Sequence, residues 1–408
     1  MGARGVESTP RWSVIVSLLG LALLTARSGH AAEWTITPFA SIGGDYDDNA
    51  GLASRADEED EISGGVAQVG AGVAYESQTN LFRIIPKLVA KRYPGDSDRD
   101  ADDQKVNSMF LHTTRNSQWG ARVNFTRDYI RTGERADVDF DTEDPEDIPE
   151  DDSGRVGARV RRIKWEIGPR WSQRLSEKAY IATQVRYIDL SYDDTLETRL
   201  VDYNQTQASA RYSYRLSNLN TALVEANGLW FDAGEADNDS SSYGLLGGIQ
   251  RSLSQTMRVQ ALGGIAQTER TLGGSDTNFV GMVNLVRNLE TIQLLAQYRR
   301  SVAGSGSGTL TQRDQVNVGF TRRLSEVLTA SLGGLAYHTS SIEKNVDFDE
   351  RTYVQLRSRF MWSLTRNLDI EAIYRYSLID RQDDDESANS NAMTLWLHYR
   401  PNKFSWSR

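Results

Sequence analysis

The chain of 408 residues contains no cysteine. Disulfide bonds, thiol nucleophiles, cysteine-ligated metals and the lipid-anchored start of a lipoprotein are therefore excluded. A chain without thiols suits passage through the bacterial periplasm, where stray thiols would be oxidised in transit.

Residue types that catalyse reactions are scarce as well. Beyond residue 32 the histidines are His112, His338 and His398. A membrane-embedded hydrolase needs a serine, a histidine and an orienting group on one face, and only His338, near Ser340 and Ser341, is a local candidate. The sequence has no phosphate loop, no zinc spacing and no nucleic-acid-binding module. We therefore expect no enzyme, no cofactor, no metal site and no nucleic-acid partner.

Long hydrophobic runs are absent beyond the N-terminus, and the mean hydropathy is −0.52. The apolar stretch 13–25 follows Arg4 and Arg11 and precedes the small residues 29–32. It is too short for a spanning helix, which needs about 20 residues, so it predicts a secretory signal peptide over 1–32, cleaved near Ala31 or Ala32. Removing its three arginines and one glutamate changes the formal charge from −10 to −12.

A short phrase recurs along the chain at intervals of 35 to 41 residues: Arg174-Leu175-Ser176, Arg215-Leu216-Ser217, Ser252-Leu253-Ser254, Asn288-Leu289-Glu290, Arg323-Leu324-Ser325 and Ser363-Leu364-Thr365. A stretch of alternating apolar and polar residues follows each copy. Such a period indicates a repeated supersecondary unit, here an up-strand, a long loop, a down-strand and a tight turn. The repeat predicts an all-β, transmembrane up-and-down antiparallel β-barrel over 33–408.

Eighteen strands are expected, an even number that places both termini on one side: 34–45, 63–76, 80–93, 104–116, 118–130, 155–168, 178–191, 201–216, 219–232, 241–253, 256–270, 276–287, 290–303, 311–324, 327–341, 351–365, 367–380 and 391–400. Connections after even-numbered strands are tight and those after odd-numbered strands are longer and often acidic. That is the asymmetry of outer-membrane barrels, with short periplasmic turns and long outer loops.

Three strands leave room for a count of 16. Pro86 lies inside a strand, where proline removes a ladder hydrogen bond, and 155–168 changes phase near Arg161. Both are interpreted as bulges. The strand at 104–116 has no clean phase.

Aromatic residues cluster where strands end, as in the two girdles at lipid–headgroup level. Ordinary strand propensity is the alternative cause of this pattern. The predicted members are Trp119, Trp171, Tyr180, Trp362, Phe404 and Trp406 near the turns, and Tyr93, Tyr129, Tyr192 and Trp230 near the loops.

On most strands every second residue is polar. If these polar residues face the barrel interior, the lumen is rich in bases although the protein is acidic. The expected lumen-lining bases are Arg83, Lys87, Lys91, Arg122, Arg186, Arg211, Arg258, Arg299, Arg323, Arg357, Arg359 and Arg375. The expected acids are Asp128, Glu225, Asp369 and Glu371. A wall whose charges have one sign concentrates counter-ions, and rings of arginine and lysine select anions. The alternative is that the arginines only cross-brace a polar interior.

The loops carry the opposite charge. Residues 137–152 contain ten acids and no base. They do not match a calcium loop, because Thr142 replaces its glycine and Ile148 its bidentate glutamate. A solvated, repulsive loop is expected, with loose binding of divalent cations near lipopolysaccharide as the alternative. The long segment 131–154 is also the candidate for a constriction loop.

The segment from Tyr46 to Leu52 reads Tyr-Asp-Asp-Asn-Ala-Gly-Leu. With the Leu-Ser turns, it resembles outer-membrane β-barrel porins found with bacterial exopolysaccharide and capsule systems. The resemblance implies a Gram-negative outer-membrane protein that contacts lipid, lipopolysaccharide and the barrel-assembly machinery. Its cargo would be small anions or an acidic exopolysaccharide. A structural barrel with a plugged lumen and acidic extracellular loops is the second hypothesis. The end at Phe404 to Arg408 departs from the usual terminal aromatic, so either Trp406 or Phe404 serves that role or the last strand is longer.

Overall fold

A computed structural model describes residues 32–55, 57–95, 99–131, 134, 159–193, 200–234, 239–270, 274–342, 350–381 and 386–407. Nearly all of the predicted signal peptide and the whole acidic loop 137–152 lie outside these ranges. Within them, no helix has the length and apolar character needed to cross a bilayer.

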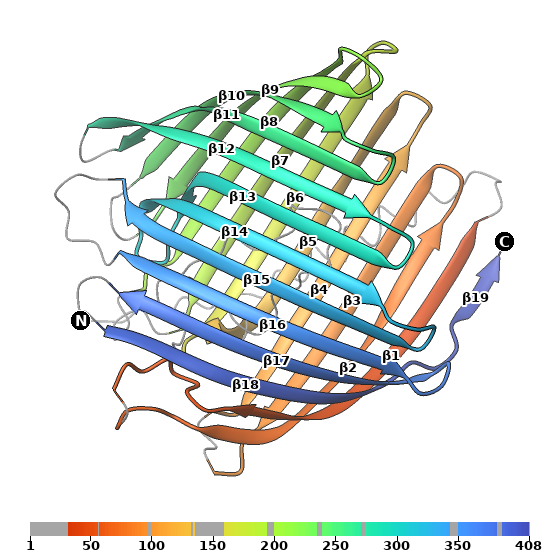
Figure 1. The fold of residues 1–408 in the computed structure, drawn as a ribbon, viewed down its shortest axis with the longest axis vertical. Coiled ribbons are helices and arrows are strands. Elements are labelled where there is room, and N and C mark those ends of the chain that lie inside the picture. The colour runs from red at the N-terminus through yellow and green to blue at the C-terminus, as the bar shows by residue number, and fades with distance from the viewer. Residues whose placement is uncertain are drawn as a thin grey trace, which may run out of the picture.

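The strands form one antiparallel sheet that closes on itself (Figure 1). Each strand pairs with the next one along the chain, and β1 (Glu33–Asp47) pairs with both β2 (Ile62–Glu76) and β18 (Glu386–Tyr399). The prediction of an up-and-down barrel of eighteen strands is therefore confirmed. Closure gives every strand of the wall two neighbours and leaves no free sheet edge around the barrel.

The strands between β2 and β18 contain 13 or 14 residues each. They are β3 (Asn80–Arg92), β4 (Ala101–Thr113), β5 (Ser117–Tyr129), β6 (Arg161–Arg174), β7 (Ala179–Tyr192), β8 (Tyr203–Arg215), β9 (Asn220–Asp232), β10 (Ser240–Ser252), β11 (Met257–Arg270), β12 (Ser275–Asn288), β13 (Ile292–Gly304), β14 (Leu310–Arg323), β15 (Leu328–Ser341), β16 (Arg351–Ser363) and β17 (Leu368–Arg381).

The repeated Leu-Ser phrase forms the tight turns. In the turn between β6 and β7, the N–H groups of Leu175 and Ser176 both donate to the carbonyl oxygen of Ala179. The Ser176 hydroxyl accepts the Ala179 N–H at 3.0 Å, and Ser217 and Ser325 repeat this contact. The phrase recurs because a short hydroxyl side chain satisfies the backbone of the turn, although Glu290 takes that position in the turn between β12 and β13.

Neither of the two irregularities that were expected to be bulges inserts an extra residue in the described strands. β6 begins at Arg161, so the apparent phase change in 155–168 marks the start of the strand. At Pro86 the β2–β3 ladder passes from the pair Gly70 and Lys87 to the pair Val73 and Ile84 without a change of register. The proline therefore interrupts the pairing because it lacks an N–H.

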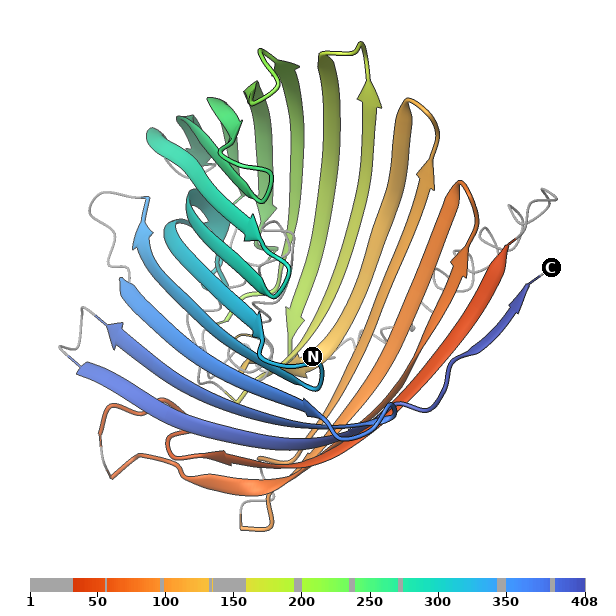
Figure 2. The same ribbon diagram turned by 45° about the vertical axis from the view of Figure 1, so that its right-hand side comes forward.

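A small additional strand extends the closure. β19 (Phe404–Ser407) follows β18 after Pro401 and pairs with the first residues of β1 (Figure 2). Between the two ladders, three residues of β1 oppose four residues of the C-terminal segment, so a bulge joins β18 to β19. Trp406 stacks on Trp34, with ring centroids 6.3 Å apart. The strand region at this end is thus longer than 391–400.

The outer surface of the wall is apolar. Along each strand, residues on this surface alternate with residues that face the interior. On β10, for example, Leu245 is 60% exposed whereas its neighbour Leu246 is 6% exposed. The exposed aromatics include Trp119, Trp171, Tyr180, Trp362, Phe404 and Trp406 at the turn end and Trp230 at the loop end.

Two predicted girdle members are corrected. Tyr93 and Tyr192 are buried, because each lies on the inward parity at the end of its strand.

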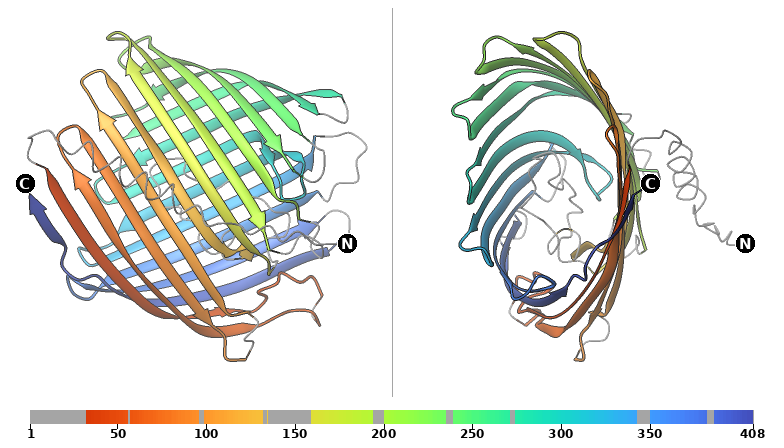
Figure 3. Two further views of the ribbon diagram at one scale, coloured as in Figure 1. Left: turned by 180° about the vertical axis from the view of Figure 1, so that it is seen from behind. Right: turned by 90° about the vertical axis from the view of Figure 1, so that its right-hand side faces the viewer.

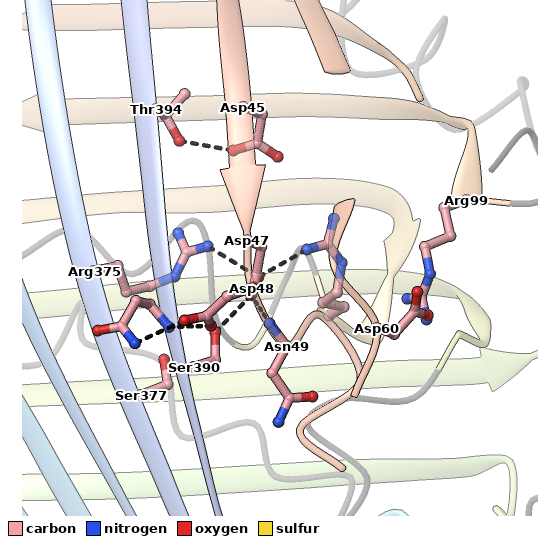
Figure 4. A network of polar contacts seen from close by, with 12 residues as sticks. Asp45, Asp47, Asp48, Asn49, Asp60, Arg99, Arg375, Ser377, Ser390 and Thr394 are labelled. Carbon is pink, nitrogen blue, oxygen red and sulfur yellow. Dashed lines mark hydrogen bonds and ion pairs between the residues drawn. The ribbon is translucent and has the colours of Figure 1, made fainter. Parts of the chain in front are cut away.

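The segment from Tyr46 to Leu52 closes the barrel seam (Figure 4). Asp47 is fully buried, accepts a hydrogen bond from the Ser390 hydroxyl at 2.6 Å and forms an ion pair with Arg131 at 3.2 Å. Asp48 accepts hydrogen bonds from the backbone and side-chain nitrogens of Asn391. The first strand is therefore fixed to the last by carboxylates as well as by the ladder.

The same segment also braces the loop that follows β1. The Asn49 side chain exchanges two hydrogen bonds with the backbone of Ala53 and donates a third to the carbonyl oxygen of Asn389. Tyr93 donates to the Asp45 carboxylate at 2.8 Å. Burial and the nearby Asp45 raise the pKa of the Tyr93 phenol, so it remains a donor.

Replacing Asp47 with alanine is expected to destabilise the barrel by about 3–5 kcal/mol, since Arg131 would lose its buried partner. Urea unfolding of detergent-solubilised barrels, followed by tryptophan fluorescence, measures the change. The control is Asp380→Ala, which removes an exposed carboxylate from β17. Equal stabilities of the two variants would contradict a role for Asp47 in closure.

Candidate functional site

A cavity of about 750 Å³ lies inside the barrel. Its wall is built by side chains from β3 through β13, so the cavity lies within the lumen, between the two sides of the sheet seen in Figure 3. Strand alternation accounts for its lining, since every second residue of each strand points inward.

One part of the cavity wall, here called the basic wall, carries ten cationic side chains: Arg83, Lys105, Arg122, Arg162, Lys164, Arg170, Arg186, Arg211, Arg299 and Arg300. The acids in the same cavity are Asp128, Glu166 and Glu225. This excess of positive charge lies inside a protein whose net charge is −10. The cavity therefore carries a local charge opposite in sign to the net charge of the molecule.

Each of the three carboxylates is held by a base of a neighbouring strand, and Glu166 also by Lys164 of its own strand. Asp128 accepts from Arg162 at 2.8 Å and lies 3.7 Å from Lys105. Glu166 contacts Arg186 at 3.0 Å and Lys164 at 3.7 Å, and Glu225 contacts Arg211 at 2.6 Å. Some of the inward arginines and lysines therefore do cross-brace the interior.

Cross-bracing does not account for all of the bases. In the ranges that the structure describes, no ion pair joins Arg83 to a carboxylate, and Arg170 contacts the sulfur of Met109 at 3.9 Å. Two of the counted bases also pair with acids that do not line the cavity, Arg300 with Asp314 and Arg162 with Glu134, both at 3.4 Å, so the unbraced surplus is smaller than the cavity count. The surplus positive charge can act on a mobile anion.

Seven of the predicted lumen residues line this cavity: Arg83, Arg122, Arg186, Arg211, Arg299, Asp128 and Glu225. The others lie outside it, on the parity opposite to the exposed apolar residues of their strands: Lys87, Lys91, Arg258, Arg323, Arg357, Arg359, Arg375, Asp369 and Glu371. Several of these are braced. Glu371 contacts Arg359 and His398 at 2.5 Å, Asp369 contacts Arg400, and Lys91 contacts Asp103. Their part in permeation stays a prediction.

Sequence reasoning missed five of the bases and one acid of the cavity. Arg162, Lys164, Glu166 and Arg170 all lie on the inward parity of β6. The misplaced start of that strand hid them, and the unclear phase of 104–116 hid Lys105. The alternation from Ile163 to Ile167 was the signal that could have found the first group. No alternation in the sequence could have placed Arg300 in the cavity, because it lies where β13 leaves the wall.

Sequence reasoning also missed an apolar part of the cavity. Leu246, Leu262, Ala266, Val280 and Met282, here called the apolar wall, line it from β10, β11 and β12. They pack with Leu223 of β9 in one cluster. All point inward, whereas the polar parity was expected to be inward on every strand.

The hairpin of β13 and β14 bends into the barrel (Figure 3, right). Its ladder with β12 ends at the pair Gly281 and Arg300, whereas β13 and β14 stay paired to Gly304 and Leu310. The Gly304 N–H donates to Oε1 of Gln205 on β8 at 3.1 Å, and Leu310 joins an apolar cluster with Leu190 and Phe231. This hairpin therefore reaches strands five positions away and narrows the lumen.

Small residues permit that contact. A Cβ atom at Gly304 would lie 2.5 Å from both Oε1 of Gln205 and a ring carbon of Phe231, and Gly308 has a φ of 79°. The constriction loop was expected at 131–154. Most of that segment lies outside the described residues, and the hairpin tip at 304–309 supplies a constriction in the described part of the barrel.

The remaining candidate for chemistry is His338, near Ser340 and Ser341 on β15. His338 lies on the outward parity of β15, and its Nδ1 is 3.1 Å from the hydroxyl of Thr352. Within the described ranges, no three histidine, aspartate or glutamate side chains gather as metal ligands.

No protein-family model and no curated protein matches this chain. Solved structures with a similar fold include OccAB3 of Acinetobacter baumannii, at 10% identity and a TM-score of 0.44, covering 92% of this chain and 99% of that one. OccK5 (OpdH) of Pseudomonas aeruginosa has 9% identity and a TM-score of 0.45, covering 90% and 98%. OccK2 (OpdF) of the same species, solved with glucuronate, has 8% identity and a TM-score of 0.44, covering 92% and 100%. Similarities this distant carry no conclusion about the cargo.

Replacing Gly304 with valine is expected to push the hairpin away from β8 and β9, because the new side chain overlaps Gln205 and Phe231. The single-channel conductance in planar bilayers should then rise above that of the natural protein. Gly247→Val is the control, since open space surrounds its Cβ position on β10. An unchanged conductance in a folded Gly304 variant would show that this hairpin does not limit the pore.

Proposed function

We propose that the protein is an outer-membrane β-barrel pore that passes small anionic solutes through a basic lumen. Three features support this proposal. The wall is closed, its outer surface is apolar and its interior contains a cavity rich in bases. An apolar band around a polar interior is the pattern of a barrel in lipid. Such a protein would contact lipid, lipopolysaccharide and the barrel-assembly machinery.

The observation that carries the choice of anions is the charge of the cavity, with ten bases against three acids. Charges inside a low-dielectric wall act over longer distances than charges in bulk water. The surplus therefore lowers the energy of an anion in the lumen and raises that of a cation. The three acids cancel part of this charge through their ion pairs, and the excess of bases over acids supplies the remaining positive field.

An acidic exopolysaccharide is the second candidate cargo, since it would meet the same basic wall. Its support is the resemblance of the Tyr46–Leu52 segment and the Leu-Ser turns to porins of exopolysaccharide systems. The β13–β14 hairpin favours small solutes over a polymer, because its tip reaches β8 and leaves less open cross-section. Export of polymer by a deletion strain separates the two cargoes.

A structural barrel with a plugged lumen is the alternative from a different class. The inward hairpin and its apolar cluster favour it, because both occupy space in the lumen. A plugged barrel would be silent in planar bilayers, whereas a pore conducts.

For the protein reconstituted in a planar bilayer with a gradient of KCl, we expect a reversal potential whose sign shows that chloride permeates more readily than potassium. The preference should weaken as the salt rises from about 0.01 M to 1 M, because the screening length falls from about 30 Å to 3 Å. A preference for cations would contradict the proposed cargo, and an absence of conductance would support the plugged alternative.

The variant Arg83→Gln tests the wall itself, since it removes one base from the cavity. Its reversal potential should move toward zero while the conductance persists. Arg251→Gln is the matched control, because Arg251 shares the outward parity of β10 with Leu245 and Ile249. Equal shifts in both variants would assign the selectivity to net charge rather than to the lumen.

A further inference from the structure

The apolar wall is unexpected inside an aqueous lumen. Leu246, Leu262 and Met282 belong to three successive strands, all point inward, and all are between 5% and 8% exposed. Contact between apolar surface and water is unfavourable, so the lining of a simple water-filled channel is polar. The other members of the cluster cover most of the surface of these side chains. The small part that stays exposed lines the cavity and can contact the apolar part of a ligand.

The apolar wall touches the basic wall directly. Nη2 of Arg299 on β13 lies 3.9 Å from the sulfur of Met282 on β12. The amide nitrogens of Asn284 and Gln297 lie 3.2 Å and 3.9 Å from the same sulfur. A cationic group and two amide donors therefore surround one edge of an aliphatic surface.

We propose that the cavity is a binding site for organic anions with an apolar body, such as a medium-chain carboxylate. The anionic group would face Arg299 and the rest of the basic wall, and the hydrocarbon would lie on Leu246 and Leu262. This inference deepens the proposed function and rests on it, since it names the class of anion that the pore prefers.

The combination of the two walls excludes the neighbouring classes. A cation with the same body would meet the surplus of bases, and a small polar anion would gain nothing from the leucines. A neutral apolar molecule would leave the basic wall unused. The volume of about 750 Å³ lies in the range of small-molecule sites.

The test compares hexanoate, acetate and hexylammonium as inhibitors of the chloride current through single channels. Hexanoate should halve the current at a concentration roughly tenfold lower than acetate, a difference of about 1.4 kcal/mol. Burial of part of its four additional carbons accounts for that difference. Hexylammonium should inhibit far less than hexanoate.

Two isosteric variants assign the effect to the apolar wall. In Leu262→Asn and Met282→Gln, the concentration of hexanoate that halves the current should come close to that of acetate. Leu335→Asn is the matched control, because Leu335 is an equally buried inward leucine of a different cluster and should preserve the preference.

The failures of the two proposals are distinguishable. A channel that prefers anions but responds equally to hexanoate and acetate would overturn this inference alone. Equal inhibition by hexylammonium would overturn the requirement for an anionic group. A loss of preference in the Leu335 variant as large as in the Leu262 variant would overturn the assignment to the apolar wall. A channel that prefers cations, or does not conduct, would overturn the proposed function as well.

Discussion

Closure of the sheet between β1 and β18 is the interaction on which the rest of the structure depends. A closed sheet pairs its backbone groups internally, so it needs no water along its edges. Closure also separates an inside from an outside. Only then do alternate side chains of a strand face two different environments. Asp47 and Asp48 reinforce this seam at its loop end, where the ladder itself stops. The segment from Tyr46 to Leu52, which resembles porin sequences, thus has a structural role in closing the barrel.

Inside the closed wall, two kinds of surface act over different distances. The bases of the cavity act at long range, because little water screens them between the walls. In the proposed pore they select the sign of the charge that enters. The apolar wall acts only on contact, since its effect scales with the area removed from water. In the proposed binding site it distinguishes one anion from another only after the charge has brought the anion close.

The β13–β14 hairpin shows how a barrel of this width limits its own opening. Its strands leave β12 at Gly281, and its tip lies against Gln205 and Phe231 across part of the lumen. Glycine at position 304 makes this contact possible, because any side chain would overlap the opposite wall. A constriction made by a paired hairpin keeps its backbone hydrogen bonds while it crosses the interior.

The sequence alone predicted the barrel and the tight turns and favoured eighteen strands over sixteen, because a period of two and the Leu-Ser turns are local properties of the chain. The inward parity of Arg122 and Arg211 followed from the same alternation. Only the tertiary structure decided the start of β6, the apolar wall and the inward hairpin. Strand alternation points these apolar side chains of β10 to β12 into the lumen, and packing across neighbouring strands buries them there. Gly304 meets Gln205 across 99 positions of sequence, and no local pattern encodes a contact of that kind.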